Sequence, residues 1–296
     1  MNSTEAGERA GLGDQLFAGL QRVLPTRWLS SMVHRVAQIQ HPGFKNALIR
    51  LFMRGFTIDL TEAERSRVED YVSFNDFFTR ALKPGARPLA ADPRAFLSPV
   101  DGTVSQFGQI RDGRLIQAKG HSYSLLDLLA GDTERAAAFA DGEFCTIYLA
   151  PYNYHRIHMP LDGRLQRWTY VPGRLFSVNA ATARALPNLF ARNERLNAIF
   201  DTDAGPVGLI MVGALFVGSL ETVWAGMVSP PHLRAEPTEY EPMTPVTLPR
   251  GAEIGRFNMG STVILLAPRQ RVQWDTKLQP GQPIRQGQSL GSWTPA

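Results

Sequence analysis

From Pro99 onward the chain is a succession of short apolar runs separated by glycine and proline. Runs of this length, rich in β-branched residues and bounded by turn residues, are typical of β-strands. The 26 glycines and 21 prolines among the 296 residues supply the turns between them. We therefore expect a β-rich core, with helices near residues 124–129 and 179–186 and a surface loop at 236–249. The strands are expected at residues 102–110, 143–149, 163–171, 207–218, 223–228 and 262–267.

The first sixty residues have a different pattern. Apolar residues recur there at helical spacing in three segments, and Pro25 closes the first of them. The chain is therefore expected to belong to the α+β class, with amphipathic helices in residues 1–60 and a β-rich domain in residues 61–296. The apolar positions are Leu16, Phe17, Leu20, Val23 and Leu24, then Leu29, Met32, Val33 and Val36, then Phe44, Leu48, Leu51, Phe52 and Phe56.

The charge of these helices allows two interpretations. Between Arg22 and Arg54 there are six lysines or arginines and no acidic residue, and Lys45, Arg50 and Arg54 are expected to point away from the apolar stripe. A basic amphipathic helix can lie on anionic lipid with its apolar face in the bilayer. Alternatively, the helices pack on the β-rich domain. The missing acids and Trp28 favour the membrane.

The composition argues against a secreted protein, a membrane-spanning protein, a nucleic-acid-binding protein and a disulfide-bonded protein. The N-terminus lacks a basic region followed by an apolar one, and no apolar run reaches the roughly 20 residues that span a bilayer. We therefore expect a peripheral protein on the cytoplasmic face of the membrane. A net charge of +4 suits an anionic surface, but no aromatic platform for nucleic acid accompanies it. The single cysteine, Cys145, excludes an intramolecular disulfide and is expected to be buried.

Three local motifs carry residues suited to catalysis. Asp101 lies at a turn before an apolar run, His155 and His158 are three residues apart, and the pair Gly260-Ser261 opens an apolar strand. A serine nucleophile needs a base, and the base needs an orienting carboxylate. Asp101, His158 and Ser261 are candidates for these roles, although their spacing does not show that they meet.

Two other kinds of site fit less well. The histidine pair would need at least a third ligand to hold zinc, and no second pair has ligand spacing, so no metal is expected. A hydrolase serine on a strand–helix elbow would follow the pattern G-x-S-x-G. Here a strand follows Ser261 and that pattern is absent.

Seven stretches, taken in order, identify a family that the chain resembles. They are PVDG at 99–102, QAKGHSYSL at 117–125, YHRIHMP at 154–160, YVPG at 170–173, PNLFARNER at 187–195, ETVWAG at 221–226 and GST at 260–262. Together they resemble the bacterial phosphatidylserine decarboxylases, which are pyruvoyl-dependent, and the resemblance runs nearly from end to end. An amphipathic N-terminal segment is also what this family leads us to expect.

The resemblance implies a proenzyme that cuts itself between Gly260 and Ser261. The Ser261 hydroxyl attacks the Gly260 carbonyl, His158 takes the hydroxyl proton, and Asp101 orients the imidazole. The resulting ester is eliminated, and the serine becomes a pyruvoyl group. A β chain of residues 1–260 and an α chain of residues 261–296 are then partners.

The resemblance also implies the second reaction. The covalent pyruvoyl cofactor forms a Schiff base with phosphatidylserine and accepts electrons as CO2 leaves, so that phosphatidylethanolamine is released without pyridoxal phosphate. His155 is the candidate proton donor. His121, Arg192 and Arg195 are candidates for binding the substrate, each with a structural role as the alternative. Asn153 stands where the family leads us to expect an acid.

Two other functions remain open at this point. One is a membrane-surface lipid hydrolase that uses Ser261, His158 and Asp101. The other is a non-enzymatic, basic membrane-binding module. The expected partners are phosphatidylserine and an anionic membrane surface, with a homo-oligomer as a further possibility and no nucleic acid.

Overall fold

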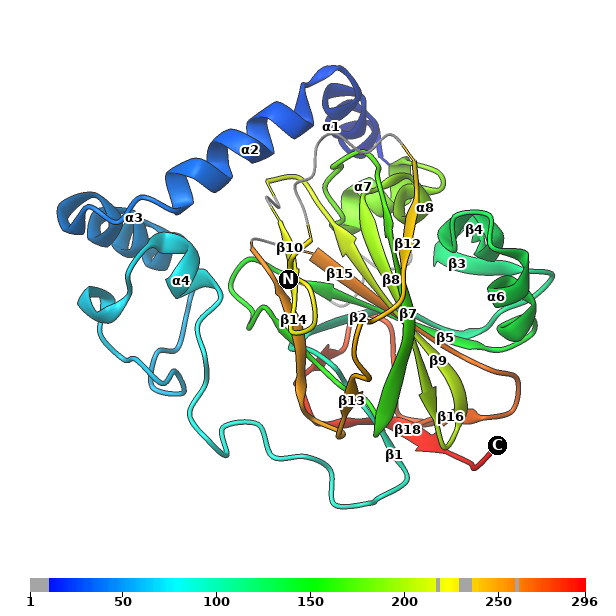
Figure 1. Cartoon of the computed structure of the whole chain (residues 1–296). Helices are drawn as coiled ribbons and strands as arrows, with labels where there is room; N and C mark the ends of the chain where they lie inside the picture. Colours follow the sequence, from blue (N-terminus) through cyan, green and yellow to red (C-terminus); the bar gives the residue numbers. More distant parts are fainter. Residues whose placement is uncertain (1–10, 217–218, 229–235, 259–260) are drawn as a thin grey trace.

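The structure is a computed structural model that describes residues 11–216, 219–228, 236–258 and 261–296 (Figure 1). Its helices are α1 (Leu12–Val23), α2 (Thr26–Ala37), α3 (Pro42–Gly55), α4 (Phe74–Phe78), α5 (Leu125–Leu128), α6 (Thr133–Ala138), α7 (Ala180–Ala185) and α8 (Leu189–Arg192). Its first nine strands are β1 (Ala95–Leu97), β2 (Gly102–Gln109), β3 (Arg114–Ala118), β4 (His121–Ser124), β5 (Glu143–Leu149), β6 (Arg156–His158), β7 (Gly163–Val171), β8 (Arg195–Thr202) and β9 (Gly205–Gly213). The remaining strands are β10 (Leu220–Thr222), β11 (Gly226–Met227), β12 (Thr238–Tyr240), β13 (Thr247–Leu248), β14 (Glu253–Phe257), β15 (Ser261–Ala267), β16 (Val272–Trp274), β17 (Pro283–Ile284) and β18 (Ser289–Trp293).

A large antiparallel sheet forms the centre of the molecule. Its strand order is β12-β7-β8-β9-β15-β5-β2-β17, and β13 also pairs with β7. Strand β15 lies in the middle of this order, where Ser261 is opposite Gly213 of β9 on one side and Leu149 of β5 on the other. All seven residues of β15 are buried. A strand covered on both faces reads as a continuous apolar run, which is how Val263–Ala267 reads in the sequence.

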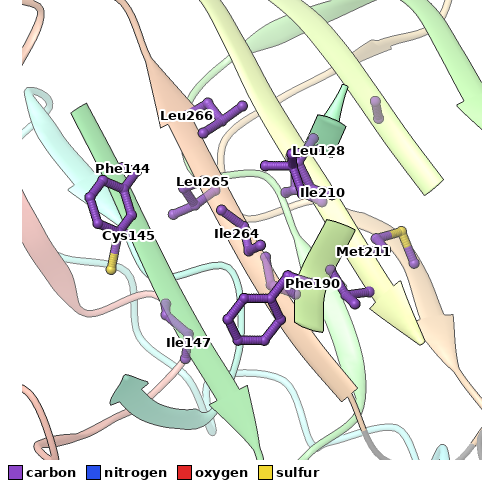
Figure 2. Close-up of a cluster of buried hydrophobic side chains, with 14 of the residues drawn as sticks. Leu128, Phe144, Cys145, Ile147, Phe190, Ile210, Met211, Ile264, Leu265 and Leu266 are labelled. Atoms are coloured by element: carbon purple, nitrogen blue, oxygen red, sulfur yellow. The ribbon is translucent and has the colours of Figure 1, made fainter. Parts of the chain in front are cut away.

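The core is built around β15 and its two neighbours. Figure 2 shows Ile264, Leu265 and Leu266 of β15 among side chains of β5 and β9, with Leu128 and Phe190 from the short helices beside them. Cys145 belongs to this cluster and is fully buried, as the sequence predicts.

A four-stranded sheet of order β11-β10-β14-β6 lies next to the central one and brings the histidine motif towards Ser261. His158 at the end of β6 pairs with Glu253, and the Phe257 N–H donates to the His155 carbonyl at 3.1 Å. Phe257 is the last residue of β14 and precedes Ser261 by only four positions, so this hydrogen bond holds the backbone of His155 against a segment next to the expected cleavage point.

Helix α1 is amphipathic with its apolar face turned outward. Leu12, Leu16, Leu20 and Val23 are 80, 73, 56 and 80% exposed. On its inner side Gln21 is buried against α7 and the segment before it, accepting from the Ser177 N–H at 2.7 Å and donating to the Thr182 hydroxyl. A helix packed only for its own fold would bury the leucines instead. Of the two interpretations of this segment, the exposed stripe favours the membrane.

Helix α3 packs on α4 through a small aromatic cluster. Ile49, Phe74, Phe77 and Phe78 are buried together there. Lys45, predicted to point away from the apolar stripe, is nevertheless buried, and its ammonium group donates to the Glu69 carbonyl at 3.2 Å. A lysine can bury its methylene stem when its charged end finds oxygen acceptors.

The α+β class is confirmed, and so are the three N-terminal helices. Residues 236–249, predicted as a loop, contain β12 and β13 instead, which pair with the edge strand β7. The sequence did not predict the sheet β1-β18-β16, which joins residues far apart in the chain. Within the described residues, no helix has both the length and the apolar character needed to cross a bilayer.

We expect the central strand to dominate stability. Because Leu265 is fully buried in the core, Leu265→Ala should lower the free energy of unfolding by about 2–5 kcal/mol. The control Leu51→Ala, at a residue that is 63% exposed, should change it by less than about 0.5 kcal/mol. Urea denaturation monitored by fluorescence measures both, and equal midpoints for the two variants would contradict this view of the core.

Candidate functional site

Ser261 is the first residue of β15 and is buried between β9 and β5. Its hydroxyl oxygen has no hydrogen-bond partner among the described residues. Buried hydroxyl groups nearly always find a partner, so one that lacks a partner in the centre of a sheet calls for a functional explanation. A hydroxyl without a structural hydrogen bond is free to react.

His155 is fully buried beside this strand system. Its Nδ1 lies 2.8 Å from the Asn153 carbonyl, and since a carbonyl only accepts, Nδ1 carries the proton. Its Nε2 therefore holds a lone pair, and that atom also has no partner among the described residues. The imidazole packs on the Phe78 ring at a centroid distance of 4.1 Å. Burial lowers the pKa of His155 to about 3, against the weaker opposing effect of the Asn153 carbonyl.

His158 has a partner for each ring nitrogen. Nδ1 donates to the Gly251 carbonyl at 2.8 Å, so Nε2 accepts from the Tyr154 hydroxyl at 2.9 Å. Burial lowers the pKa of His158, while Gly251 and the negative charges of Glu253 and Asp101 act in the opposite direction. His158 and Tyr154 line a cavity of about 460 Å³ that also includes Arg87 and Gln286.

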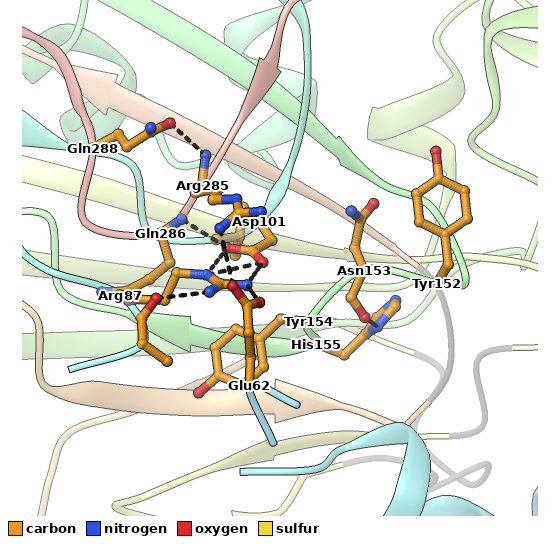
Figure 3. Close-up of polar contacts among 12 residues, drawn as sticks. Glu62, Arg87, Asp101, Tyr152, Asn153, Tyr154, His155, Arg285, Gln286 and Gln288 are labelled. Carbon is orange, nitrogen blue, oxygen red and sulfur yellow. Dashed lines mark hydrogen bonds and ion pairs between the residues drawn. The ribbon is translucent and has the colours of Figure 1, made fainter. Parts of the chain in front are cut away.

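Asp101 is held by an arginine rather than by a histidine. Figure 3 shows the guanidinium of Arg87 between the carboxylates of Asp101 and Glu62. Arg87 reaches Asp101 at 2.6 Å and Glu62 at 2.9 Å, and the Gln286 N–H donates to Asp101 at 2.8 Å. Burial alone would lower the pKa of Arg87, but these two carboxylates raise it. Gly102, the next residue, lets β2 approach β5 closely, since a Cβ there would lie 2.5 Å from the Tyr148 carbonyl oxygen.

The structure brings the three expected triad residues into one region without joining their side chains. The His158 N–H donates to the Pro99 carbonyl at 2.8 Å, which places His158 next to the turn that carries Asp101. No hydrogen bond links Asp101, His158 and Ser261 to one another in the described structure. The triad therefore stays a prediction. Gly260, the other side of the expected cleavage point, lies outside the described residues.

Asn153 has a structural role that explains why an amide can stand where the family leads us to expect an acid. Its side-chain oxygen accepts from the Ala150 N–H at 2.8 Å and closes the turn before His155. A carboxylate oxygen would accept the same bond. The part of Asn153 that acts on His155 is its carbonyl, which any residue provides.

The candidate substrate-binding residues have different surroundings. Arg195 is buried and donates to the carbonyls of Leu128, Ala191, Asn193 and Asp127, which favours the structural alternative. His121 begins β4 in the separate two-stranded sheet β3-β4. Arg192 is exposed and stacks over the Phe176 ring at 5.2 Å.

Sequence reasoning missed two residues of this site. Tyr154 is part of the YHRIHMP stretch, so its place before the histidines was a usable signal. Arg87 belongs to a turn rich in proline and glycine, where nothing in the sequence indicates a partner for Asp101. Among the described residues, no group of three or more histidine, cysteine, aspartate or glutamate side chains is arranged to hold a metal ion.

Comparison with known proteins gives a consistent result. A family model described as phosphatidylserine decarboxylase matches residues 74–292, and a second one, described as PSD, matches residues 16–57. The chain is similar to proteins named phosphatidylserine decarboxylase proenzyme. It is 50% identical over 280 residues to that of Stutzerimonas stutzeri, covering 94% of each chain. It is 51% identical to those of Bordetella pertussis, covering 94% of each, and Pseudomonas fluorescens, covering 95% of this chain and 98% of the other.

The buried state of His155 predicts a pH dependence of stability. Its pKa is about 3 in the folded protein and 6.5 for an ordinary histidine, so between these values the unfolded chain binds the extra proton. The stabilising contribution is then complete above the higher value and is lost as the pH falls towards the lower one. We expect the free energy of unfolding of the wild type, measured by urea denaturation, to fall more steeply below neutral pH than that of His155→Gln, by at most about 1.4 kcal/mol per pH unit. Parallel profiles for the two proteins would contradict the assignment.

Proposed function

Because the chain belongs to the phosphatidylserine decarboxylase family, we propose that it is a proenzyme that cuts itself before Ser261 and then decarboxylates phosphatidylserine through a pyruvoyl group formed from that serine. The observation that carries the proposal is the unpartnered hydroxyl of Ser261, buried at the first position of the central strand. The name proenzyme, shared by the relatives, also supports a processing step.

In the proposed cleavage, the Ser261 hydroxyl attacks the Gly260 carbonyl and the amide becomes an ester. Glycine before the serine suits this step because it has no Cβ to obstruct the approach. His158 is the proposed base: its Nδ1 proton is fixed on Gly251, so its lone pair is on Nε2. Tyr154 holds that nitrogen in the present arrangement, and it must release the nitrogen or relay the proton for His158 to act.

Asp101 is proposed to assist His158 through its charge. Its carboxylate is fixed by Arg87 and the Gln286 N–H, and its negative charge favours the protonated form of the imidazole. A base that becomes cationic during proton transfer is stabilised by a fixed negative charge nearby.

When formed, the pyruvoyl group supplies a carbonyl that condenses with the substrate amine and accepts the electrons left by departing CO2. His155 is the proposed proton carrier in this reaction. Its lowered pKa keeps the imidazole neutral, so it must first accept the proton that the substrate ammonium group loses when it condenses. It can then return that proton to the substrate carbon, while Phe78 and the Asn153 carbonyl hold the ring in place.

The N-terminal helices are proposed to bind the cytoplasmic face of an anionic membrane as a peripheral segment of residues 1–60, with residues 61–296 as the catalytic domain. The outward stripe of Leu12, Leu16, Leu20 and Val23 supports this. The sequence from Arg22 to Arg54 adds positive charge without acids. Together these features suit an interfacial helix whose substrate is a lipid.

The experiment that tests the proposed function is an intact mass measurement of freshly purified protein. The wild type should give two polypeptides, residues 1–260 and 261–296, the smaller beginning with a pyruvoyl group. Ser261→Ala should remain one uncut chain, because the nucleophile is absent. His158→Ala should also remain uncut.

His155→Ala serves as the matched histidine control. It should be cut like the wild type and then release CO2 from phosphatidylserine at least about 100-fold more slowly, the usual range for a lost general acid–base group. Cleavage of Ser261→Ala at the same bond would refute the self-processing step. Labelling of wild-type Ser261 by a fluorophosphonate would instead indicate a lipid hydrolase, since a pyruvoyl group has no hydroxyl.

Membrane binding is tested by flotation with anionic vesicles. If each leucine of the α1 stripe contributes about 1.5 kcal/mol on entering the bilayer, Leu12→Ser with Leu16→Ser should weaken binding roughly 100-fold. Gln15→Ser, at an exposed polar position on the same helix, should bind like the wild type. Equal flotation of the leucine variant and the wild type would reject the anchoring role of α1.

A further inference from the structure

Two arginines are fixed side by side at the surface near the end of α1. The backbones of Arg174 and Arg192 are joined directly, since the Arg174 N–H donates to the Arg192 carbonyl at 2.9 Å. The segments can approach this closely because Gly173 precedes Arg174: a Cβ there would lie 2.4 Å from the Asn193 carbonyl carbon. Their spacing is therefore set by the backbone and does not depend on flexible side chains alone.

Both guanidinium groups cover the same aromatic ring. Arg174 lies 5.4 Å and Arg192 5.2 Å from the centroid of Phe176, which is otherwise buried. Stacking on a ring restrains a guanidinium while leaving its N–H groups free to donate. Both arginines are exposed, so the donors that make no bond within the protein face solvent.

The pair carries positive charge that the described ion pairs do not neutralise. None of the ion pairs found among the described residues involves Arg22, Arg174 or Arg192. Burial lowers the pKa of Arg192, and the positive charges of Arg22 and Arg174 lower it further, as expected for cations held close together. Such a cluster is stabilised by binding an anion.

The cluster is connected both to the exposed leucine stripe and to the strand of Ser261. Arg174 donates to the Arg22 carbonyl at 3.0 Å, in the last turn of α1. On the inner side, the Asn193 amide donates to the carbonyls of Phe176 and Gly213. Gly213 is the partner of Ser261 in the sheet.

We propose that Arg174 and Arg192, together with Arg22, form a binding site for the phosphodiester of a membrane phospholipid, whose acyl chains lie along the leucines of α1. The forked donors of two arginines match the oxygens of a phosphate group. The exposed leucines beside them match the hydrocarbon that a free phosphate lacks. This site deepens the proposed function, since it would bring lipid headgroups to the side of the sheet where Ser261 lies.

The test is flotation of the full chain with vesicles of phosphatidylglycerol. Phosphatidylglycerol has no amine or carboxylate to react, so this readout does not depend on decarboxylation. Arg174→Gln with Arg192→Gln should lose affinity for phosphatidylglycerol by roughly fivefold for each arginine, as expected for about 1 kcal/mol per basic residue at an anionic surface. With phosphatidylserine as substrate, KM should rise more than kcat falls.

The matched control is Arg111→Gln with Arg269→Gln, which removes the same charge at two exposed positions. These residues follow the ends of β2 and β15 that lie furthest from Ser261. The control should bind phosphatidylglycerol like the wild type. Equal losses in both double variants would show a general charge effect and overturn the site.

Two further outcomes separate the alternatives. Calorimetry with inorganic phosphate should show only weak binding, and tight binding of free phosphate that displaces the vesicles would overturn the assignment to a lipid. Wild-type protein that floats as described but never releases CO2 would count against the proposed function and leave the arginine site intact.

Discussion

The position of β15 in the middle of the central sheet is the constraint on which the rest of the molecule depends. The strand pairs with β9 and β5 along its length, and each of its seven residues is buried. Ser261 therefore has a fixed place at the start of the central strand. Its neighbours on β9 and β5 are hydrogen-bonded to the same strand and move with it. The sheet β10-β14-β6 is attached to the same point by the short connection from Phe257 to Ser261, and it brings both histidines with it.

The helices at the molecular surface are connected to this site by aromatic contacts. Phe52 of α3 packs against Phe78 of α4 at 6.1 Å, and Phe78 stacks on His155 at 4.1 Å. The lipid-facing segment that we propose and the buried imidazole are thus two contacts apart. Aromatic packing of this kind holds a ring more firmly than aliphatic contacts of the same area. The N-terminal helices therefore belong to the support of the site as well as to the surface.

Much of this arrangement was predictable from the sequence, and what was missed has physical reasons. The limits of β5 and β7 were predicted to the residue, because a long apolar run bounded by turns has few alternatives. Strands β8 and β14 were missed, since polar residues such as Asn197 and Arg256 interrupt their apolar pattern. The burial of Lys45 was not predicted, because a carbonyl acceptor from a distant segment offsets its cost.

In the candidate site, too, some residues were predictable from the sequence and others were not. Local motifs identified the histidines and Ser261, but the Arg87–Asp101 pair joins residues from two loops and had no signature. A burial pattern can be read from one segment of the chain. An ion pair depends on how two distant segments fold together, so a single sequence predicts burial far better than ion pairing. The outward stripe of α1 shows a related limit, because helical periodicity gives the apolar face but not the direction in which that face points.

The central place of β15 would also determine how the protein behaves on denaturation if it is cut before Ser261, as we propose. Before cleavage, one continuous chain folds and the strand finds its place as part of that chain. After the proposed cleavage, residues 261–296 would be held only by hydrogen bonds and packing, and heating would release them as a separate fragment that carries the apolar strand β15. Refolding would then require the two separate polypeptides to associate and β15 to insert between β5 and β9 before either polypeptide aggregates. If the protein is cut as we propose, its thermal inactivation should be irreversible, and its lifetime at high temperature should be governed by the rate of unfolding.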